Sequence, residues 1–229
     1  MPEKSDGPAV AVIAGTPYDS GLGAELLRAA GLPAQPHAMA ASPDEQDALQ
    51  YQDPAGLAAT FHRCLAELRA AGTDLAMLFC NSMSAVVDHD HTALPVVSPV
   101  TVYRELLPQL RSSLVVTGNT QGLLGVERTA WRVAPGHRVL GVSDPALVRA
   151  IEASGTEAGD AEAAFTASHL PTTLRMAERL GIEAVVLACT HFTTLLPFIT
   201  AVCDLRVVDV SSRLVELTSL AATGSEHHG

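Results

Sequence analysis

Positive charge is scarce in this chain of 229 residues. Lysine and arginine together number 14 against 25 acidic residues, and the formal net charge is -11. Binding to nucleic acid needs a basic face that displaces counterions from the phosphates. We therefore expect no nucleic-acid partner. A small anionic substrate is still compatible with an acidic protein, because backbone N–H groups, hydroxyls and helix N-termini can bind it.

Long apolar runs and dense cysteine are also missing. Stretches such as 75–79 are far too short to span a bilayer, so we expect no membrane partner. Residues 1–8 carry acids, a lysine and prolines, and they lack the basic and apolar regions of a signal peptide. Four cysteines are too few for a secreted disulfide scaffold. We expect a cytoplasmic protein with free thiols.

The composition is sufficient for a large packed core, since 48% of the residues are hydrophobic. Short apolar runs alternate with longer amphipathic stretches, which is typical of β-α units around parallel sheets. The predicted strands are 10–14, 75–79, 94–97, 114–117, 139–142, 184–188 and 207–210. The predicted helices are 24–30, 57–71, 102–110, 145–154 and 162–180, the last with a break at Pro171, and 15–23 is predicted to be a glycine-rich turn.

Two of the predicted strands share one design. Each is an apolar run that ends in a cysteine and is followed by small polar residues that open a helix: Cys80-Asn81-Ser82 and Cys189-Thr190-His191. The two lie about half the chain apart, which suggests two similar α/β halves. In open α/β folds, ligands bind at the carboxyl edge of the sheet, where both cysteines are expected.

A cysteine at that edge has its thiolate favoured by nearby backbone N–H groups, which makes it a usable base or nucleophile. A single cysteine of this kind is equally well explained as a small buried hydrophobe. Two in matched positions favour chemistry. Cys64 lies on the apolar face of a predicted helix and is assigned to the core, while the pattern leaves the role of Cys203 open.

Two thiols on opposite sides of a carbon atom suit the removal of a proton from one face and its return to the other. The charge that develops beside a carboxylate must be met by preorganised donors. Candidate donors stand at predicted strand ends and turns: Ser20, Asn81, Ser82, Thr117, Thr120 and Thr190. Any one of them alone is explained as a turn or cap residue.

Three motifs together resemble the signatures of bacterial glutamate racemases, in the aspartate/glutamate racemase superfamily. They are Asp-Ser-Gly-Leu-Gly at 19–23, Cys-Asn-Ser at 80–82 and Cys-Thr-His at 189–191. Weaker similarity extends to 94–97, 117–120 and 147–152, so the resemblance covers most of the chain in the same order.

The resemblance implies an α/β fold of two pseudo-symmetric flavodoxin-like domains with parallel sheets and an active site in the interdomain cleft. The first domain would comprise 1–98 plus 210–229, and the second 99–209. The activity implied is a racemase or epimerase that needs no cofactor and no metal. The partner would be a small amino-acid or dicarboxylate substrate, and a homodimer is left open.

The resemblance also implies roles for single residues. Cys80 and Cys189 would be the catalytic pair, with Cys80 on the side of the D-antipode. Asp19 would assist Cys80, and His191 and Glu152 would serve Cys189, while Asn81, Ser82, Thr117 and Thr190 would hold the amino acid. The alternatives are a structural or capping histidine at 191 and a solvated acid at the end of a helix at 152.

The sequence departs from the glutamate racemase pattern in one loop. Between the first signature and Cys80 those enzymes have a Pro-Tyr-Gly segment, which is missing here. Ser82 stands where threonine is usual, and Ala188 stands where glycine is usual. The run Asp-His-Asp-His at 88–91 is read as solvated rather than metal-binding, because no second ligand cluster with zinc-like spacing accompanies it.

Three functions therefore compete. The first is a two-cysteine racemase of glutamate or aspartate. The second is an isomerase or decarboxylase of small diacids that uses one cysteine, and the third is a non-catalytic amino-acid-binding protein. The matched cysteines favour the first, and the missing loop is the one feature that supports the third.

Overall fold

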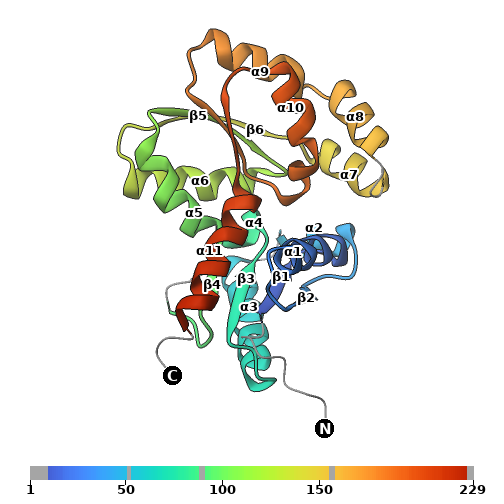
Figure 1. Ribbon diagram of the computed structural model, residues 1–229, viewed down its shortest axis with the longest axis vertical. Coiled ribbons are helices and arrows are strands. Elements are labelled where there is room, and N and C mark those ends of the chain that lie inside the picture. Colours follow the sequence, from blue (N-terminus) through green and yellow to red (C-terminus); the bar gives the residue numbers. More distant parts are fainter. Residues whose placement is uncertain (1–9, 51–52, 88–90, 155–157, 226–229) are drawn as a thin grey trace. The chain divides into compact units, whose positions relative to one another are not determined.

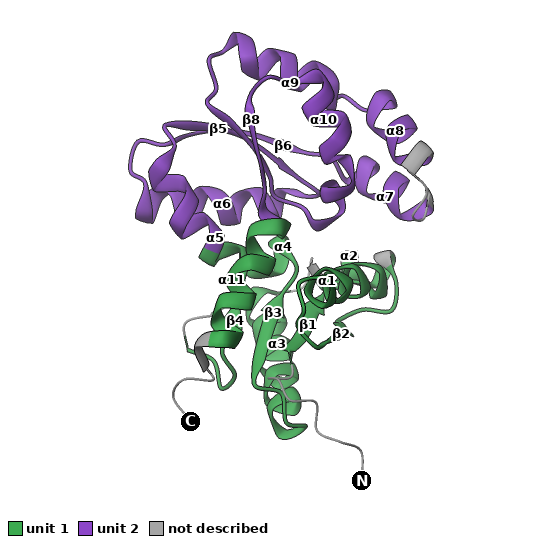
Figure 2. Ribbon diagram, in the orientation of Figure 1, with its two compact units in different colours: residues 1–101, 211–229 green, residues 102–210 purple. Residues whose placement is uncertain are grey.

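The computed structural model describes residues 10–50, 53–87, 91–154 and 158–225. They form two compact units, which have different colours in Figure 2. Unit 1 combines residues 1–101 with 211–229, and unit 2 is the continuous segment 102–210. The chain thus builds unit 2 without interruption and then returns to complete unit 1.

Unit 1 contains a four-stranded parallel sheet with the strand order β2-β1-β3-β4 (Figure 1). The strands are β1 (Val10–Ala14), β2 (Ala34–Ala38), β3 (Leu75–Leu78) and β4 (Val96–Val97). The helices are α1 (Pro17–Ala29), α2 (Pro43–Gln50), α3 (Pro54–Ala70) and α4 (Asn81–Ser84), with α5 (Pro99–Leu106) leading into unit 2 and α11 (Val210–Ser225) leading back.

Burial explains why the central strands of unit 1 are continuous apolar runs. Every residue of β1 and β3 is buried, as expected for a parallel sheet that helices cover on both faces. One face packs against Phe61 and Leu65 of α3. On the other face α1 comes very close, because a Cβ atom at Gly23 would lie 2.7 Å from Val12 Cγ1. Only glycine fits there without displacing the strand.

Unit 2 repeats the strand order of unit 1, as β6-β5-β7-β8, and all its pairs are parallel. The strands are β5 (Ser112–Thr117), β6 (Arg138–Ser143), β7 (Ala184–Leu187) and β8 (Arg206–Asp209). The helical segments are η1 (Leu107–Gln109), α6 (Thr120–Val133), α7 (Pro145–Ser154), α8 (Ala158–Ala167), α9 (Leu170–Arg179), η2 (Thr190–Leu195) and α10 (Leu196–Val202), where η denotes a 3₁₀-helix.

A large core cluster of unit 2 lies on one face of its sheet. Leu114, Val185 and Leu187 of the strands pack there with buried residues of α7 to α10, such as Leu174 and Ile199. In Figure 1, α9 and α10 lie on one side of this sheet and α6 lies on the other. The two sheets with their shared strand order confirm the predicted α/β fold of two similar flavodoxin-like halves.

The structure corrects the sequence prediction at two places in unit 1, the start of helix α1 and strand β2. The segment 15–23 is not a turn, because α1 begins at Pro17, with the Thr16 hydroxyl accepting the N–H of Asp19. Proline at the first turn of a helix costs no hydrogen bond, which explains this early start. Strand β2 was not predicted, since Ala34–Ala38 contains a proline and polar residues that only an edge strand tolerates.

The long helix predicted over 162–180 is divided as expected near Pro171. Helix α8 ends at Ala167, and α9 begins at Leu170 with the proline in its first turn. Among the described residues, no helix is long and apolar enough to cross a membrane.

Candidate active site

Cys80 and Cys189 occupy equivalent positions in the two units. Each follows the last residue of a central parallel strand by two positions, after Leu78 in β3 and Leu187 in β7. Each precedes a short helical segment and has an extended backbone, with φ and ψ of -155° and 114° at Cys80 and -148° and 132° at Cys189. The repeated sequence pattern therefore corresponds to a repeated backbone conformation at the carboxyl edge of each sheet.

Cys80 has hydroxyl and amide neighbours in unit 1. Its side chain is buried, and its Sγ atom lies 3.4 Å from Ser82 Oγ, so either atom can donate a hydrogen bond to the other. Asn81 is also buried, and its carbonyl oxygen accepts a hydrogen bond from Ser84 Oγ at 2.8 Å. These polar groups lie beside a sulfur that otherwise packs in the apolar core of the unit.

Asp19 and Ser20 lie in the first turn of α1 and are both buried, at 2% exposure. The Thr16 hydroxyl accepts the backbone N–H of Asp19, and its oxygen lies 3.3 Å from the carboxylate Oδ2 to which it can donate. Ser20 Oγ donates to the carbonyl oxygen of Pro17. A buried acid at this end of α1 is stabilised by the positive end of the helix dipole.

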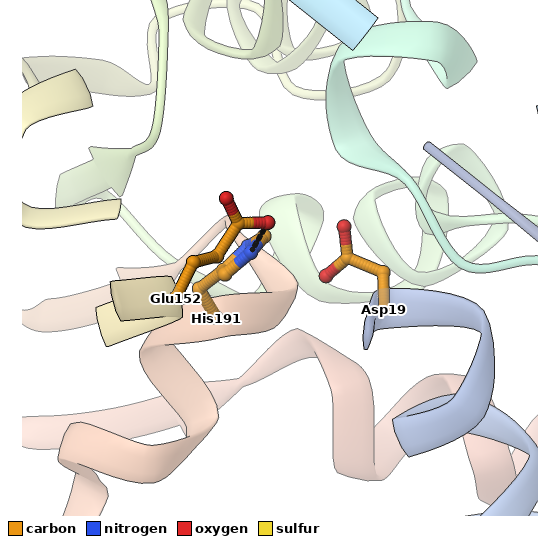
Figure 3. A group of neighbouring side chains, drawn as sticks. All are labelled: Asp19, Glu152 and His191. Carbon is orange, nitrogen blue, oxygen red and sulfur yellow. Dashed lines mark hydrogen bonds and ion pairs between the residues drawn. The ribbon is translucent and has the colours of Figure 1, made fainter. Parts of the chain in front are cut away.

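Cys189 has an ionisable neighbour in unit 2. It is half-buried, and its Sγ atom lies 3.7 Å from Nδ1 of His191, within hydrogen-bond reach for sulfur. Nε2 of His191 lies 2.9 Å from Oε1 of Glu152, and Figure 3 shows this pair. The third residue in Figure 3, Asp19, belongs to unit 1. Sulfur, imidazole and carboxylate of unit 2 therefore form one continuous chain.

This chain has the arrangement of an activated nucleophile or base. The side chains of His191 and Glu152 are 4% and 11% exposed, so Glu152 is not a solvated acid at a helix end. The carboxylate accepts a hydrogen bond from Nε2, which directs Nδ1 toward the sulfur and fixes the ring. Nδ1 can then accept the thiol proton or, in the imidazolium, donate to the thiolate.

Gly118, directly after β5, keeps space open beside the sulfur of Cys189. A Cβ atom at this position would lie 3.0 Å from Cys189 Sγ and 2.9 Å from Cγ2 of Val148. The turn itself is held by Asn119, whose side chain accepts the N–H of Gly122 at the start of α6. Glycine is therefore required for the close approach of the turn and the thiol.

The two threonines predicted in this turn differ in their surroundings. The Thr117 hydroxyl is buried and lies 2.8 Å from the carbonyl oxygen of Asn119 and 2.9 Å from Ser143 Oγ, so it is already engaged within the unit. Thr120 is exposed in the first turn of α6. Thr190, after Cys189, is buried.

The run Asp-His-Asp-His at 88–91, which was predicted to be solvated, lies mostly outside the described residues. Of its four residues, these include only His91.

Burial also affects the two remaining thiols, Cys64 and Cys203. It raises the pKa of Cys64 from an ordinary 9.0 to about 11, with a smaller contribution from the nearby charge of Glu67. Burial likewise raises the pKa of Cys203. Both thiols stay protonated at neutral pH, and both pack in apolar clusters. Cys64 is therefore a core residue, as predicted, and Cys203 is one too.

Two residues near Cys189 were not assigned a role from the sequence. Tyr103 of α5 is fully buried, and burial together with the charge of Cys189 raises the pKa of its phenol well above the ordinary value. It therefore remains a neutral group on the Cys189 side of unit 2. Gly118 belongs to the segment 117–120, which resembles the racemase pattern. Its closeness to the sulfur of Cys189, 71 positions later in the chain, cannot be predicted from the local sequence.

Comparison with known proteins gives one family. The model of the Asp/Glu/Hydantoin racemase family matches residues 24–218. No curated protein matches the chain.

Several solved structures have a similar fold. A glutamate racemase isoform from Bacillus anthracis is 13% identical, with a TM-score of 0.71 over 95% of this chain and 82% of that one. A glutamate racemase from Francisella tularensis in complex with D-glutamate is 16% identical, with a TM-score of 0.64 over 97% and 83%. An allantoin racemase from Klebsiella pneumoniae is 18% identical, with a TM-score of 0.63 over 95% and 89%.

Proposed function

The chain belongs to the Asp/Glu/Hydantoin racemase family, and from this premise we propose that it is a cofactor-independent racemase or epimerase of an acidic amino acid. Cys80 and Cys189 would be its two bases. Glutamate and aspartate are the first candidate substrates. Each cysteine stands at the carboxyl edge of its own sheet, where ligands of open α/β folds bind.

The observation that carries this proposal is the connected set Cys189, His191 and Glu152. The distances of 3.7 and 2.9 Å place an imidazole between a thiol and a carboxylate, and the histidine is buried. A histidine held in this way can exchange a proton with the sulfur, and the carboxylate stabilises the imidazolium that forms. A structural cysteine needs no such neighbours.

The proton transfers would proceed as follows. The Cys80 thiolate removes the α-proton of one antipode and becomes a thiol, while the electron pair of the broken C–H bond delocalises into the substrate carboxylate. The Cys189 thiol then donates its proton to the opposite face of the carbon and becomes a thiolate. The reverse direction exchanges these roles, so the enzyme must equilibrate its two thiols between turnovers.

Other residues would support these transfers. Asp19, buried at the start of α1, would assist Cys80, and Ser82 lies within hydrogen-bond reach of its sulfur. Asn81 and Thr190, each directly after a cysteine, would donate to the substrate as charge develops on its carboxylate. Ser20, Thr117 and Thr120 complete the proposed binding set at the same sheet edges.

The identity of the substrate depends on the loop that replaces the Pro-Tyr-Gly segment. The interval 33–54 contains no lysine or arginine to pair with a distal carboxylate. A charged group left unpaired in a closed site costs several kcal/mol. We therefore expect a weakened preference for glutamate, with a shift toward aspartate or a modified amino acid.

The test is an exchange screen in D₂O, read as loss of the α-proton NMR signal. The panel holds both antipodes of glutamate, aspartate and neutral amino acids, and a 5-substituted hydantoin. The Cys80→Ser/Cys189→Ser double variant is the control for background exchange. Exchange of one substrate by the wild type, with appearance of the opposite antipode, supports the proposal. Exchange or decarboxylation without any opposite antipode would instead establish a single-cysteine enzyme, and binding without exchange a non-catalytic protein.

The preference among substrates is tested by kcat/KM under one set of conditions. If glutamate exceeds aspartate and the neutral amino acids by more than about a hundredfold, roughly 2.7 kcal/mol of discrimination, another part of the chain replaces the missing loop. The expected weakening of the glutamate preference is then wrong.

A further inference from the structure

Asp209 is a buried acid at the same sheet edge as Cys189. It is the last residue of β8, where it pairs in register with Leu187 of β7, and its exposure is 8%. Since the chain runs only two residues from Leu187, the end of β7, to Cys189, the carboxylate is placed beside the segment that carries the candidate base. Burial of an acid is costly unless polar partners satisfy it.

One partner of Asp209 lies on the segment that carries His191. The hydroxyl of Thr193 donates a hydrogen bond of 3.1 Å to Asp209 Oδ1. Thr193 is half-buried in η2, two residues after His191. The carboxylate therefore joins the end of β8 to the short helix that positions the imidazole.

A 3₁₀-helix needs such external support more than an α-helix does. Its hydrogen-bond geometry is poorer, and runs longer than about four residues are uncommon. In η2, which spans Thr190–Leu195, the N–H of Phe192 bonds to the carbonyl oxygen of Cys189, and the Thr194 hydroxyl bonds to that of His191. The Thr193–Asp209 bond ties this segment to the neighbouring strand β8 through a carboxylate.

We infer that Asp209 is a positioning residue, which holds η2 through Thr193 and thereby keeps His191 in line with the sulfur of Cys189. This inference rests on the proposed role of Cys189 as a base. Asp209 itself touches no reacting atom. Misplacement of a catalytic group by about 1 Å costs up to a hundredfold in rate, so a single anchoring hydrogen bond is sufficient to matter.

Asp209 lies close to the boundary between the two units. Unit 2 ends at Val210, and the chain continues in unit 1 from Ser211. The carboxylate is thus one residue from the point where the chain leaves the unit. The Thr193–Asp209 hydrogen bond therefore also lies next to this crossing.

The test is the valine variant of Thr193, which keeps the shape of the side chain and removes the hydroxyl. The measurement is the alkylation rate of Cys189 by iodoacetamide, followed by peptide mass spectrometry, with Cys80 in the same sample as the internal reference. We expect Thr193→Val to slow alkylation of Cys189 about threefold or more relative to Cys80, because the imidazole no longer supports the thiolate. Thr193→Ser, which restores the hydroxyl, should react like the wild type.

Thr200→Val is the matched control. Thr200 is an exposed threonine of α10 whose hydroxyl bonds only locally, to carbonyl oxygens of residues 196 and 197. The Thr200→Val variant should leave the ratio of the alkylation rates of Cys189 and Cys80 unchanged. If Thr193→Val misfolds, Thr193→Ala offers a smaller side chain with the same loss. An unchanged ratio in a folded Thr193 variant overturns the inference, and so does a loss that serine does not rescue.

The outcome separates this inference from the proposed racemase activity. If the wild type exchanges no substrate proton while Thr193→Val still slows the alkylation of Cys189, the positioning role stands and the proposed racemase activity is wrong. If the wild type is active, Thr193→Val should lower kcat and leave KM nearly unchanged, because the anchor acts on a proton carrier and not on the substrate.

Discussion

The surroundings of Cys80 and Cys189 differ far more than their backbones do. Both cysteines follow a buried parallel strand and have nearly the same φ and ψ. Cys80, however, is 6% exposed and contacts a serine hydroxyl, whereas Cys189 is half-buried and contacts a histidine backed by a glutamate. A repeated fold therefore gives the two cysteines the same position, and a few side chains give them different hydrogen-bond partners and different access to solvent.

This comparison predicts an enzyme whose two directions rely on different chemistry. Cys189 could pass its proton to an imidazole backed by a carboxylate, whereas Cys80 would depend on Asp19 for the same step. The following changes either remove this asymmetry or measure it.

The largest effect is expected from replacing either cysteine by serine. Cys80→Ser or Cys189→Ser should each lower racemisation by about a thousandfold or more, since an alkoxide forms far less readily than a thiolate at neutral pH. Each single variant should retain some α-proton exchange from one antipode only, through its remaining thiol. NMR in D₂O with separate antipodes makes this measurement. Near-wild-type racemisation by Cys189→Ser would exclude the two-base mechanism.

A smaller and one-sided effect is expected from His191→Gln. General acid–base assistance by a histidine contributes about 10²- to 10⁴-fold, so exchange by way of Cys189 should fall within this range. Exchange by way of Cys80 should fall much less. Ser82→Ala is the matched change in unit 1, and it should cost less than His191→Gln because a hydroxyl supports a thiolate only by hydrogen bonding. Equal losses in both directions for His191→Gln would show that the comparison is wrong.

Gly118→Ala should reduce activity by crowding one sulfur and not the other. The added Cβ atom would lie 3.0 Å from Cys189 Sγ, and overpacking of this kind costs about 1–3 kcal/mol. We expect slower alkylation of Cys189 and a lower kcat, with no change at Cys80. Gly21→Ala is the control in unit 1, because a Cβ atom there has no neighbour within 4 Å. Equal effects of the two variants would remove the steric explanation.

The smallest effect on activity is expected from Cys64→Ala, because this thiol belongs to the core and not to the candidate catalytic pair. Burial raises the pKa of Cys64 to about 11, so its alkylation should stay slow until the pH approaches that value. The pKa of Cys64 in the folded protein lies above the unfolded value of 9.0. The contribution of the protonated thiol to the free energy of unfolding is therefore present below pH 9 and is lost as the pH rises toward 11. Unfolding titrations between pH 8 and about 11 should therefore show less alkaline destabilisation for Cys64→Ala. Identical pH slopes would contradict the burial of this thiol.

The sequence was most informative where local pattern and tertiary environment agree. Strands β1, β3 and β7 are buried on both faces, and they are therefore readable as continuous apolar runs. The positions of both cysteines followed from this pattern. That His191 and Glu152 would both serve Cys189, by contrast, was expected only from the resemblance, since no local rule connects residues 39 positions apart.

Other features depend on tertiary contacts that no local pattern records. Thr117 was predicted from its place at a strand end, but its hydroxyl bonds to Asn119 and to Ser143 of the adjacent strand. The contact of Gly118 with Cys189 and the bond between Thr193 and Asp209 likewise depend on how the turns of neighbouring strands meet. Strand β2 was missed because edge strands tolerate polar residues and proline.

The discontinuous make-up of unit 1 has a consequence for synthesis on the ribosome. Residues 102–210 are contiguous, so unit 2 has all of its sheet as soon as β8 has emerged. Unit 1 begins first, but it receives α11 only after unit 2 has been synthesised. Leu214, Thr218 and Ala222 of that helix are spaced four apart and buried, so the surface that they cover is exposed until then. The nascent chain must therefore protect an unfinished N-terminal unit while a complete second one folds behind it.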